Sequence, residues 1–131
     1  MPCLFKSRKQ NYGIKSIIQV LHMTWEPLTS EEQFIAILDQ SVSQPVIIFK
    51  HSTRCSISAM AKRSFEFGWP LEVNIPVYLL DLITYRSVSN LIAAKLSVVH
   101  QSPQVLLIKN GKCIYNASHE DINAAYLSSL V

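Results

Sequence analysis

The sequence lacks any apolar run close to the roughly 20 residues that cross a bilayer, so it predicts no membrane-spanning segment. Cysteine is also scarce: there are three in 131 residues, and an odd number does not make a disulfide framework. Without a signal peptide, this cysteine content favours a reducing cytoplasm. The sequence has no C-x-x-C or H-x-x-x-H pair, so a structural zinc site is not expected.

Strong positive charge is missing from most of the chain. The formal net charge is +3, but Lys6, Arg8, Lys9 and Lys15 lie among the first 22 residues, which contain no acidic residue. Residues 23–131 contain the other eight basic residues and all nine acidic residues, so their formal net charge is −1. A nucleic-acid-binding domain would carry a clustered basic surface, so no nucleic-acid partner is expected.

The chain divides into a short basic extension and one domain. Residues 1–22 include Ile14, Ile17 and Leu21 at helical spacing, but this apolar set is short. We therefore interpret residues 1–22 as a dispensable extension rather than as a membrane-surface or targeting helix. Residues 23–131 predict one globular domain that is large enough to bury a core.

Strand and helix patterns alternate along this domain. The predicted strands are Trp25–Leu28, Pro45–Lys50, Pro76–Asp81, Val105–Ile108 and Cys113–Asn116. Helices are predicted after the capping residues Thr29 and Ser30, at Ser56–Phe67, at Ser87–Leu96, and after Ser118 as the cap of the last helix. The apolar run Pro45–Phe49 predicts that the strand Pro45–Lys50 is central and parallel. Asn110-Gly111 predicts a tight hairpin with positive φ at both residues. The order predicts an α/β fold with a mixed central sheet of four to five strands and helices on both faces.

Each predicted helix has an apolar face that we expect to be buried. The residues of these faces are Phe34, Ile35 and Leu38, then Ile57, Met60, Ala61 and Phe65, then Val88, Leu91 and Ile92, and finally Ile122, Tyr126 and Leu130. Their three- and fourfold spacing is typical of helices that pack against a sheet.

Cys55 is the most informative residue, because it lies between the predicted central strand and the start of the next helix. A side chain at that position meets the first free backbone N–H groups of the helix, and Lys50, His51 and Arg54 are close in sequence. Both influences favour the thiolate, the form of cysteine that attacks disulfides. The pattern predicts thiol–disulfide exchange at Cys55. A lone cysteine can also be a small buried hydrophobe, which is our interpretation of Cys113.

This order, with a Ser-Pro just before the hairpin, resembles the thioredoxin superfamily and, more closely, the monothiol bacilliredoxin family of YtxJ type. The resemblance covers about residues 23–131. It is carried by Phe49-Lys50-His51-Ser52-Thr53, Cys55-x-Ile57-Ser58, the stretch from Asp81 to Asn90, His100-Gln101-Ser102-Pro103-Gln104, and Ala117-Ser118-His119. The family's active segment usually reads Thr-Cys-Pro-Ile-Ser, whereas this chain has Arg54-Cys55-Ser56-Ile57-Ser58. Serine in place of the proline removes the preorganisation of the first helical position.

The resemblance implies a thioredoxin-like fold and a monothiol oxidoreductase that removes bacillithiol, or a similar low-molecular-weight thiol, from protein mixed disulfides. Cys55 would be the nucleophile, and Ser58 stands where a dithiol enzyme has its second cysteine. Cys55 would therefore hold the small thiol until a second thiol molecule removes it. Pro103 would be a cis proline facing the cysteine. From the position of Ser58 one turn into the predicted helix, we expect its hydroxyl to donate a hydrogen bond to the sulfur; the alternative is that it only supports the first turn. The expected substrate-binding or thiolate-tuning residues are His51, Thr53, Arg54, Ser58, Ser102 and Pro103.

The same resemblance implies no resident cofactor or metal, since the small thiol acts as a co-substrate. The expected partners are S-thiolated proteins and the small thiol, which could also be glutathione or coenzyme A. Two other functions remain open: an iron–sulfur or metal carrier that combines Cys55 with an external thiol, and a non-catalytic module that binds a partner segment beside Pro103. Cys3, in the extension, could resolve a disulfide in principle.

Overall fold

The computed structural model describes residues 23–131, which form a five-stranded sheet with helices on both faces. The prediction that residues 1–22 are a dispensable extension lies outside the described residues. The elements in chain order are β1 (Glu26–Pro27), α2 (Glu31–Gln40), β2 (Val46–His51), α3 (Ser56–Gly68), β3 (Val77–Asp81), α4 (Arg86–Leu96), β4 (Gln104–Lys109), β5 (Lys112–Ser118), η1 (His119–Asp121) and α5 (Ala124–Ser128). The predicted order of strands and helices is confirmed. No helix in this part of the chain is long and apolar enough to cross a membrane.

The sheet is mixed, with the strand order β1-β3-β2-β4-β5. β2 is its centre, as predicted: it pairs in parallel with β3 and antiparallel with β4. β1 lies parallel to β3 at one edge, where Pro27 is tolerated because an edge strand needs fewer ladder donors. β5 returns antiparallel beside β4 at the other edge. The hairpin between them turns at Asn110 and Gly111, which have φ of 53° and 73°, as the Asn-Gly pair predicts.

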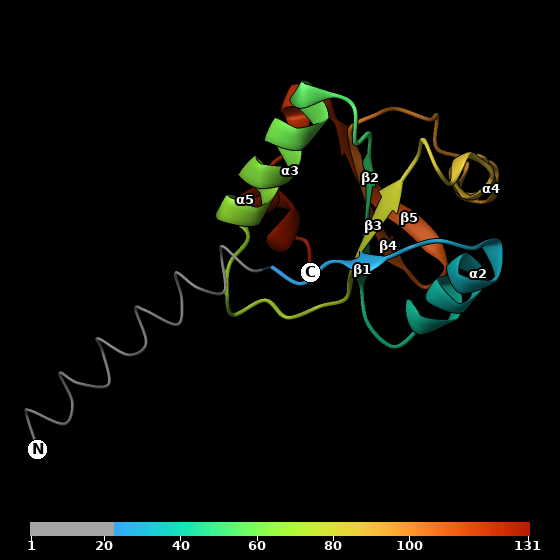
Figure 1. Ribbon diagram of the computed structural model, residues 1–131. Coiled ribbons are helices and arrows are strands. Elements are labelled where there is room, and N and C mark those ends of the chain that lie inside the picture. The colour runs from blue at the N-terminus through green and yellow to red at the C-terminus, as the bar shows by residue number, and fades with distance from the viewer. Residues whose placement is uncertain (1–22) are drawn as a thin grey trace, which may run out of the picture.

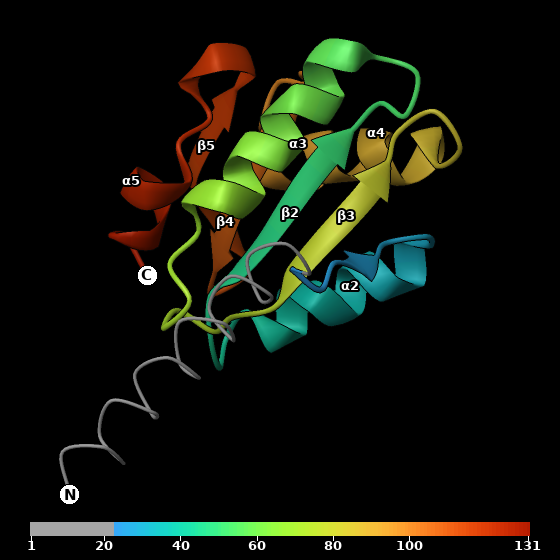
Figure 2. The ribbon, with the colours of Figure 1, turned by 60° about the vertical axis from the view of Figure 1, so that its left-hand side comes forward.

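The two faces of the sheet are covered by different pairs of helices. α3 and α5 lie on one side and α2 and α4 on the other (Figures 1 and 2). Because side chains alternate along a strand, β2 contributes Val46 and Ile48 to the core under α2 and α4, and Ile47 and Phe49 to the core under α3 and α5. Every residue of β2 is buried as a result, which explains its unbroken apolar sequence.

The starts of two helices differ in how well the sequence predicted them. Ser30 is the cap of α2, where its side chain accepts a hydrogen bond from the Gln33 N–H, as expected. The last helix does not begin at Ser118. A short 3-10 turn, η1, follows β5, and Asn123 caps α5 by accepting a hydrogen bond from the Tyr126 N–H. The prediction of Ser118 as the cap of this helix is therefore wrong.

The buried faces of the helices were predicted only in part. Phe34, Phe65, Val88 and Ile92 are buried as expected. In α2 the inward residue beside Phe34 is Ile37, whereas Ile35 is exposed. In α5 the inward residues are Ala124 and Leu127, whereas Tyr126 is exposed, as is Leu130 beyond the end of the helix. The largest difference is in α3, where Ile57 and Met60 are 63% and 69% exposed. The first two turns of α3 thus present apolar side chains to solvent next to Cys55.

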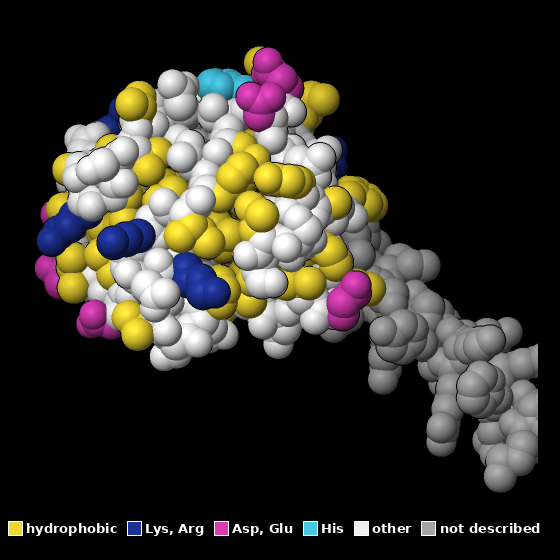
Figure 3. Space-filling view, turned by 180° about the vertical axis from the view of Figure 1, so that it is seen from behind, with side chains coloured by type: hydrophobic (Ala, Val, Ile, Leu, Met, Phe, Trp, Pro, Cys, Tyr) yellow, Lys and Arg dark blue, Asp and Glu magenta, His cyan; other side chains and the backbone are white. Residues whose placement is uncertain are grey.

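Charged groups are scattered over the surface that is visible from behind. On that face, basic and acidic side chains lie among apolar and polar ones, and the basic side chains do not form a continuous stripe (Figure 3).

Candidate functional site

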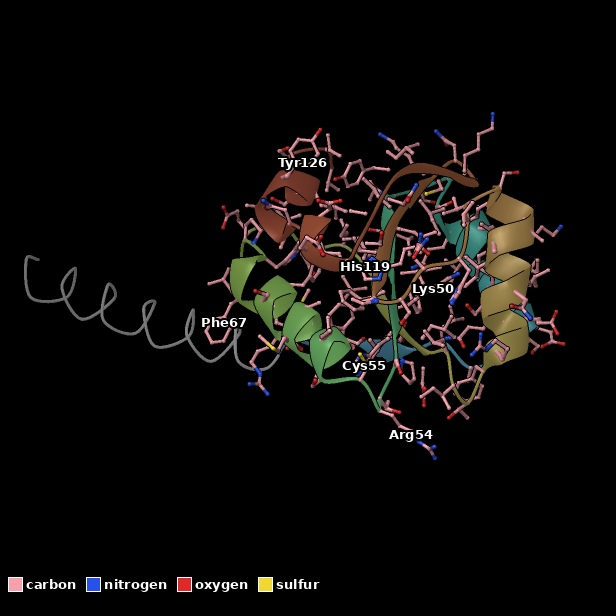
Figure 4. The ribbon with its side chains drawn as sticks, turned by 90° about the horizontal axis from the view of Figure 1, so that it is seen from above. Lys50, Arg54, Cys55, Phe67, His119 and Tyr126 are labelled. Carbon is pink, nitrogen blue, oxygen red and sulfur yellow. The ribbon has the colours of Figure 1, made fainter. Side chains whose placement is uncertain are left out.

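Cys55 is the residue that caps α3, at the end of the short loop that leaves β2 (Figure 4). A turn forms this loop: the Cys55 N–H donates to the Ser52 carbonyl at 3.2 Å, and the Cys55 carbonyl accepts from the Ala59 N–H at 3.1 Å. Cys55 has extended backbone angles, so its side chain stands at the helix N-terminus, where backbone N–H groups have no helical partner. The thiol is free and partly exposed. The predicted position of Cys55 at the start of a helix is confirmed.

Three loops meet at the end of the sheet that carries Cys55. β4 begins with Gln104 opposite Lys50, so Pro103 comes beside His51 at the point where β2 ends. β5 ends with Ser118 opposite Gln104, and the next residue, His119, donates its N–H to the Pro103 carbonyl at 3.0 Å. The loops that hold Cys55, Pro103 and His119 therefore belong to neighbouring strands and leave the sheet at the same end.

The peptide bond between Ser102 and Pro103 is cis, as the resemblance implied. Pro103 is buried, and the hydroxyl of Ser102 is buried without a hydrogen-bond partner among the described residues. That Ser102 and Pro103 contact substrate stays a prediction.

The buried side chains behind Cys55 form a small polar network on the α3 side of the sheet. The Nδ1 atom of His51 lies 2.7 Å from the Oγ atom of Ser58, and the same oxygen accepts a hydrogen bond from the Ser52 N–H at 3.1 Å. Ser58 is fully buried. The network ties the first turn of α3 to the loop between β2 and Cys55.

This network corrects the expected contact between Ser58 and the sulfur. Within the described residues the Ser58 hydroxyl is hydrogen-bonded to His51 and Ser52, and no hydrogen bond joins it to Cys55. The inward direction of Ser58 follows from its position one turn along the helix on the side that faces β2. Its role is to hold the loop, and any influence on the thiol passes through the position of Cys55.

His51 does not bring a positive charge to the thiol. Burial, followed by the charge of Lys62, lowers the pKa of His51 below its ordinary value, against the opposing effects of Asp81 and Glu66. The imidazole is therefore neutral at pH 7. The backbone N–H groups of α3 remain as the local source of positive potential.

Lys50 and Arg54 are close to Cys55 in sequence, but their side chains do not point toward its thiol. Lys50 follows Phe49 on the strand and so points to the opposite side of the sheet, toward α4. Arg54 is exposed, and its side chain points outward from the tip of the loop, away from Cys55 (Figure 4). Thr53 is exposed beside it. The expectation that Lys50 lies near the thiol is wrong, and a contact of Thr53 or Arg54 with substrate stays a prediction.

Sequence reasoning did not find the polar cluster on the α4 side of β2, in which the buried residues Lys50, Ser89 and Gln104 join the half-buried His100. The Nζ atom of Lys50 lies 3.3 Å from the Ser89 carbonyl and 3.3 Å from the Nδ1 atom of His100. The alternation of side chains along β2 could have predicted it, because it places Lys50 on the opposite face of the sheet from Phe49 and His51.

Cys113 is separate from this site. It lies on β5, and its thiol donates to the Tyr115 carbonyl at 3.3 Å. Burial raises the pKa of Cys113, against the opposing effect of hydrogen bonds. Its interpretation as part of the core is supported by its packing against the cluster under α2 and α4. Residues 23–131 contain no group of three or more His, Cys, Asp or Glu side chains that could hold a metal ion.

A stability measurement tests the role of Ser58. In Ser58→Ala, the His51 ring and the Ser52 N–H lose a buried partner, so the free energy of unfolding should fall by about 1–3 kcal/mol. The matched control is Ser56→Ala, on the exposed side of the same turn, which should change it by less than about 0.5 kcal/mol. Equal stability of the two variants in urea titrations would show that the network contributes nothing.

Comparison with known proteins places this arrangement in a family. A family model described as monothiol bacilliredoxin BrxC matches residues 26–127. Among solved structures, a protein described as an oxidoreductase with a thioredoxin fold is 34% identical with a TM-score of 0.70, and the match covers 79% of this chain and 90% of that one.

Two thioredoxins are more distant in sequence. Mitochondrial thioredoxin 3 from Saccharomyces cerevisiae is 18% identical with a TM-score of 0.61, and the match covers 82% of this chain and 92% of that one. Thioredoxin from Malassezia sympodialis is 19% identical with a TM-score of 0.60, over 82% and 87%. At such identities the two thioredoxins show the fold alone. The family match and the nearer structure show more: the chain belongs to the monothiol bacilliredoxin family, with a thioredoxin fold and a role in thiol redox chemistry.

Proposed function

We propose that this protein is a monothiol thiol–disulfide oxidoreductase that removes bacillithiol, or a similar low-molecular-weight thiol, from mixed disulfides of proteins. The observation that carries the proposal is a partly exposed thiol at the start of α3, with a buried serine at the position of a second cysteine. A thiol placed in this way can form a mixed disulfide but has no neighbouring thiol among the described residues to resolve it.

The chemistry consists of two exchange steps. The Cys55 thiolate attacks the small-thiol sulfur of the client's mixed disulfide; that S–S bond breaks, and the client cysteine leaves as a thiolate that takes a proton from solvent. A second small-thiol molecule then attacks the disulfide on Cys55. Cys55 returns to the thiolate, and the two small thiols leave as their disulfide. The electrons that reduce the client therefore come from the small thiol.

The backbone N–H groups at the start of α3 support both steps. They favour negative charge on the Cys55 sulfur when it attacks, and again when it leaves in the second step. Cys113 is poorly suited to either step, because its thiol packs against the core under α2 and α4 and donates a hydrogen bond to the Tyr115 carbonyl within β5.

The surface next to Cys55 supports a protein as the client. Ile57 and Met60 are exposed on the first two turns of α3, and with His119 and Ile122 they border a hollow of about 260 Å³. A free small-thiol disulfide would need no such apolar surface, whereas the chain around a modified client cysteine can bury it.

Mass spectrometry of the trapped intermediate tests the proposal. The full chain is mixed with a client protein that carries bacillithiol on one cysteine, without free small thiol, and the reaction is quenched in acid. We expect one bacillithiol adduct on Cys55 and a free client thiol, because the second step has no reactant. Adding free bacillithiol should then remove the adduct.

Parallel reactions identify the small thiol. Clients carrying glutathione or coenzyme A in place of bacillithiol show which adduct forms fastest. If Cys55 instead became linked to the client protein, or stayed unmodified with all three clients, the proposed function would be wrong.

A further inference from the structure

Buried polar side chains converge on the loop that precedes Pro103. Three residues that are at most 1% exposed, Lys50, Ser89 and Gln104, bond to the segment 98–103. Gln104 holds it with both polar atoms of its side-chain amide: Nε2 donates to the Val99 carbonyl at 3.1 Å, and Oε1 accepts from the Gln101 N–H at 3.4 Å. Buried polar side chains need hydrogen-bond partners, and three of them find their partners in this one loop, so the loop is held in place from several sides.

His100 is the centre of this cluster. Its Nδ1 atom lies 3.3 Å from the Lys50 Nζ atom and 3.1 Å from the Ser89 Oγ atom. An ammonium group can only donate, so the Nδ1 of His100 accepts, and the ring is neutral with its proton on Nε2. Burial, then the charges of Lys50 and Arg86, lower the pKa of His100, in agreement with a neutral ring.

Lys50 is an unusual residue for this place. It is 0% exposed, and the contacts of its Nζ atom are a carbonyl and a neutral ring rather than a carboxylate. Burial lowers the pKa of Lys50 to about 8. At pH 7 about nine-tenths of the molecules therefore still carry the charge, and the side chain acts as a donor.

The contacts of Lys50 join three parts of the structure. Its own strand, β2, leads to the Cys55 loop; Ser89 belongs to α4; and His100 lies three residues before Pro103. We propose that Lys50, acting through His100, is a positioning residue that fixes the Ser102–Pro103 loop so that the client chain can bind beside Cys55. The inference rests on the proposed function and on the prediction that Ser102 and Pro103 contact the client chain.

A purely structural role makes a different prediction. A buried charge without an ionic partner is costly, and replacing it by an apolar side chain of similar shape is often neutral or stabilising. Lys50→Met would leave the neutral His100 bonded to Ser89, so no charge would be stranded. If Lys50 served packing alone, the variant would fold and work as the parent does.

The test uses Lys50→Met in the full chain, with Lys95→Met as control, since Lys95 is an exposed lysine of α4. We expect Lys50→Met to raise the KM for the bacillithiol-carrying client about tenfold with kcat within about twofold, because ground-state binding is what the loop provides. Alkylation of Cys55 by iodoacetamide should stay within about twofold of the parent, since β2 and α3 keep their positions. Amide hydrogen exchange in residues 98–102 should accelerate about tenfold, while that of α3 stays unchanged. Lys95→Met should change none of these quantities.

Variants of His100 test whether Lys50 acts through that ring. His100→Asn places an amide oxygen near the position of Nδ1 and should keep a KM close to that of the parent. His100→Leu removes the acceptor and should match Lys50→Met. Because the two residues act as one unit, Lys50→Met combined with His100→Leu should raise KM no further than either change alone.

The outcomes separate this inference from the proposed function. An unchanged KM in Lys50→Met, unchanged exchange in residues 98–102, or multiplied effects in the double variant would overturn the positioning role. Absence of turnover by the parent chain would instead overturn the proposed function, and the exchange measurement would still show whether Lys50 holds the loop.

Discussion

Cys55→Ser is expected to lower the rate of small-thiol release from an S-thiolated client by at least about a thousandfold. A serine hydroxyl is not ionised near neutral pH, so neither the attacking anion nor the leaving group of the second step remains. The fold should be unaffected, because serine is slightly smaller than cysteine and is itself a favourable residue for starting a helix. The measurement is the initial rate of bacillithiol release at client concentrations well above and well below KM.

Cys113→Ser is the matched control for this substitution. The Cys113 thiol donates to the Tyr115 carbonyl from within β5, and a hydroxyl can make the same bond. We expect a rate within about twofold of the parent. Cys3→Ser, in the extension, should behave in the same way. Substantial activity in Cys55→Ser, or a large loss in Cys113→Ser, would assign the nucleophile to a different sulfur.

The fold could be predicted from the sequence because its strongest signals are local. The continuous apolar run Pro45–Phe49 can be buried on both faces only between two layers of helices, so it predicts the central strand. Asn110-Gly111 fixes the hairpin because few other residue pairs accept positive φ twice in succession. These signals, with the helices between the strands, leave few topologies open.

The rotation of each helix about its axis was harder to predict, because it depends on the neighbour that the helix meets. The sequence of α3 offers apolar residues on more than one side, and the structure buries Phe65 while exposing Ile57 and Met60. Hydrophobicity alone cannot distinguish a residue that packs against the sheet from one that a binding partner covers. The mistaken prediction for α3 is therefore also the observation that supports a protein client.

The site was predicted where the chemistry depends on neighbours along the chain, and missed where it depends on contacts across the fold. Cys55 could be found because the cysteine and the helix start are adjacent in sequence. Lys50 and His100 are 50 residues apart, and their contact depends on the register of β2 with β4. The sequence placed Lys50 beside the thiol by proximity, whereas strand alternation places it on the other side of the sheet.

The aromatic cluster under α3 should dominate the stability of the domain. Phe65 is 1% exposed and contacts three aromatic rings: it stacks on Trp69 with ring centres 5.5 Å apart, meets Phe49 edge-on at 5.7 Å, and lies 5.9 Å from Trp25. Phe65→Ala removes these contacts and leaves a cavity that its neighbours cannot fill. We expect the free energy of unfolding to fall by about 3–5 kcal/mol, out of the roughly 5–15 kcal/mol typical of a domain.

Phe67→Ala provides the control, because Phe67 is on the same helix, is 61% exposed and points away from the sheet (Figure 4). Its removal should change stability by less than about 0.5 kcal/mol. In urea titrations, Phe65→Ala should lower the midpoint with little change in slope, since the surface exposed on unfolding is nearly the same. Below the unfolding transition of the variant, iodoacetamide should still alkylate Cys55 at close to the parent rate, because Phe65 lies about two and a half turns from the start of α3. Equal losses in the two variants would mean that α3 is not held to the sheet by its inward aromatic face, and the position of Cys55 would then need another source of rigidity.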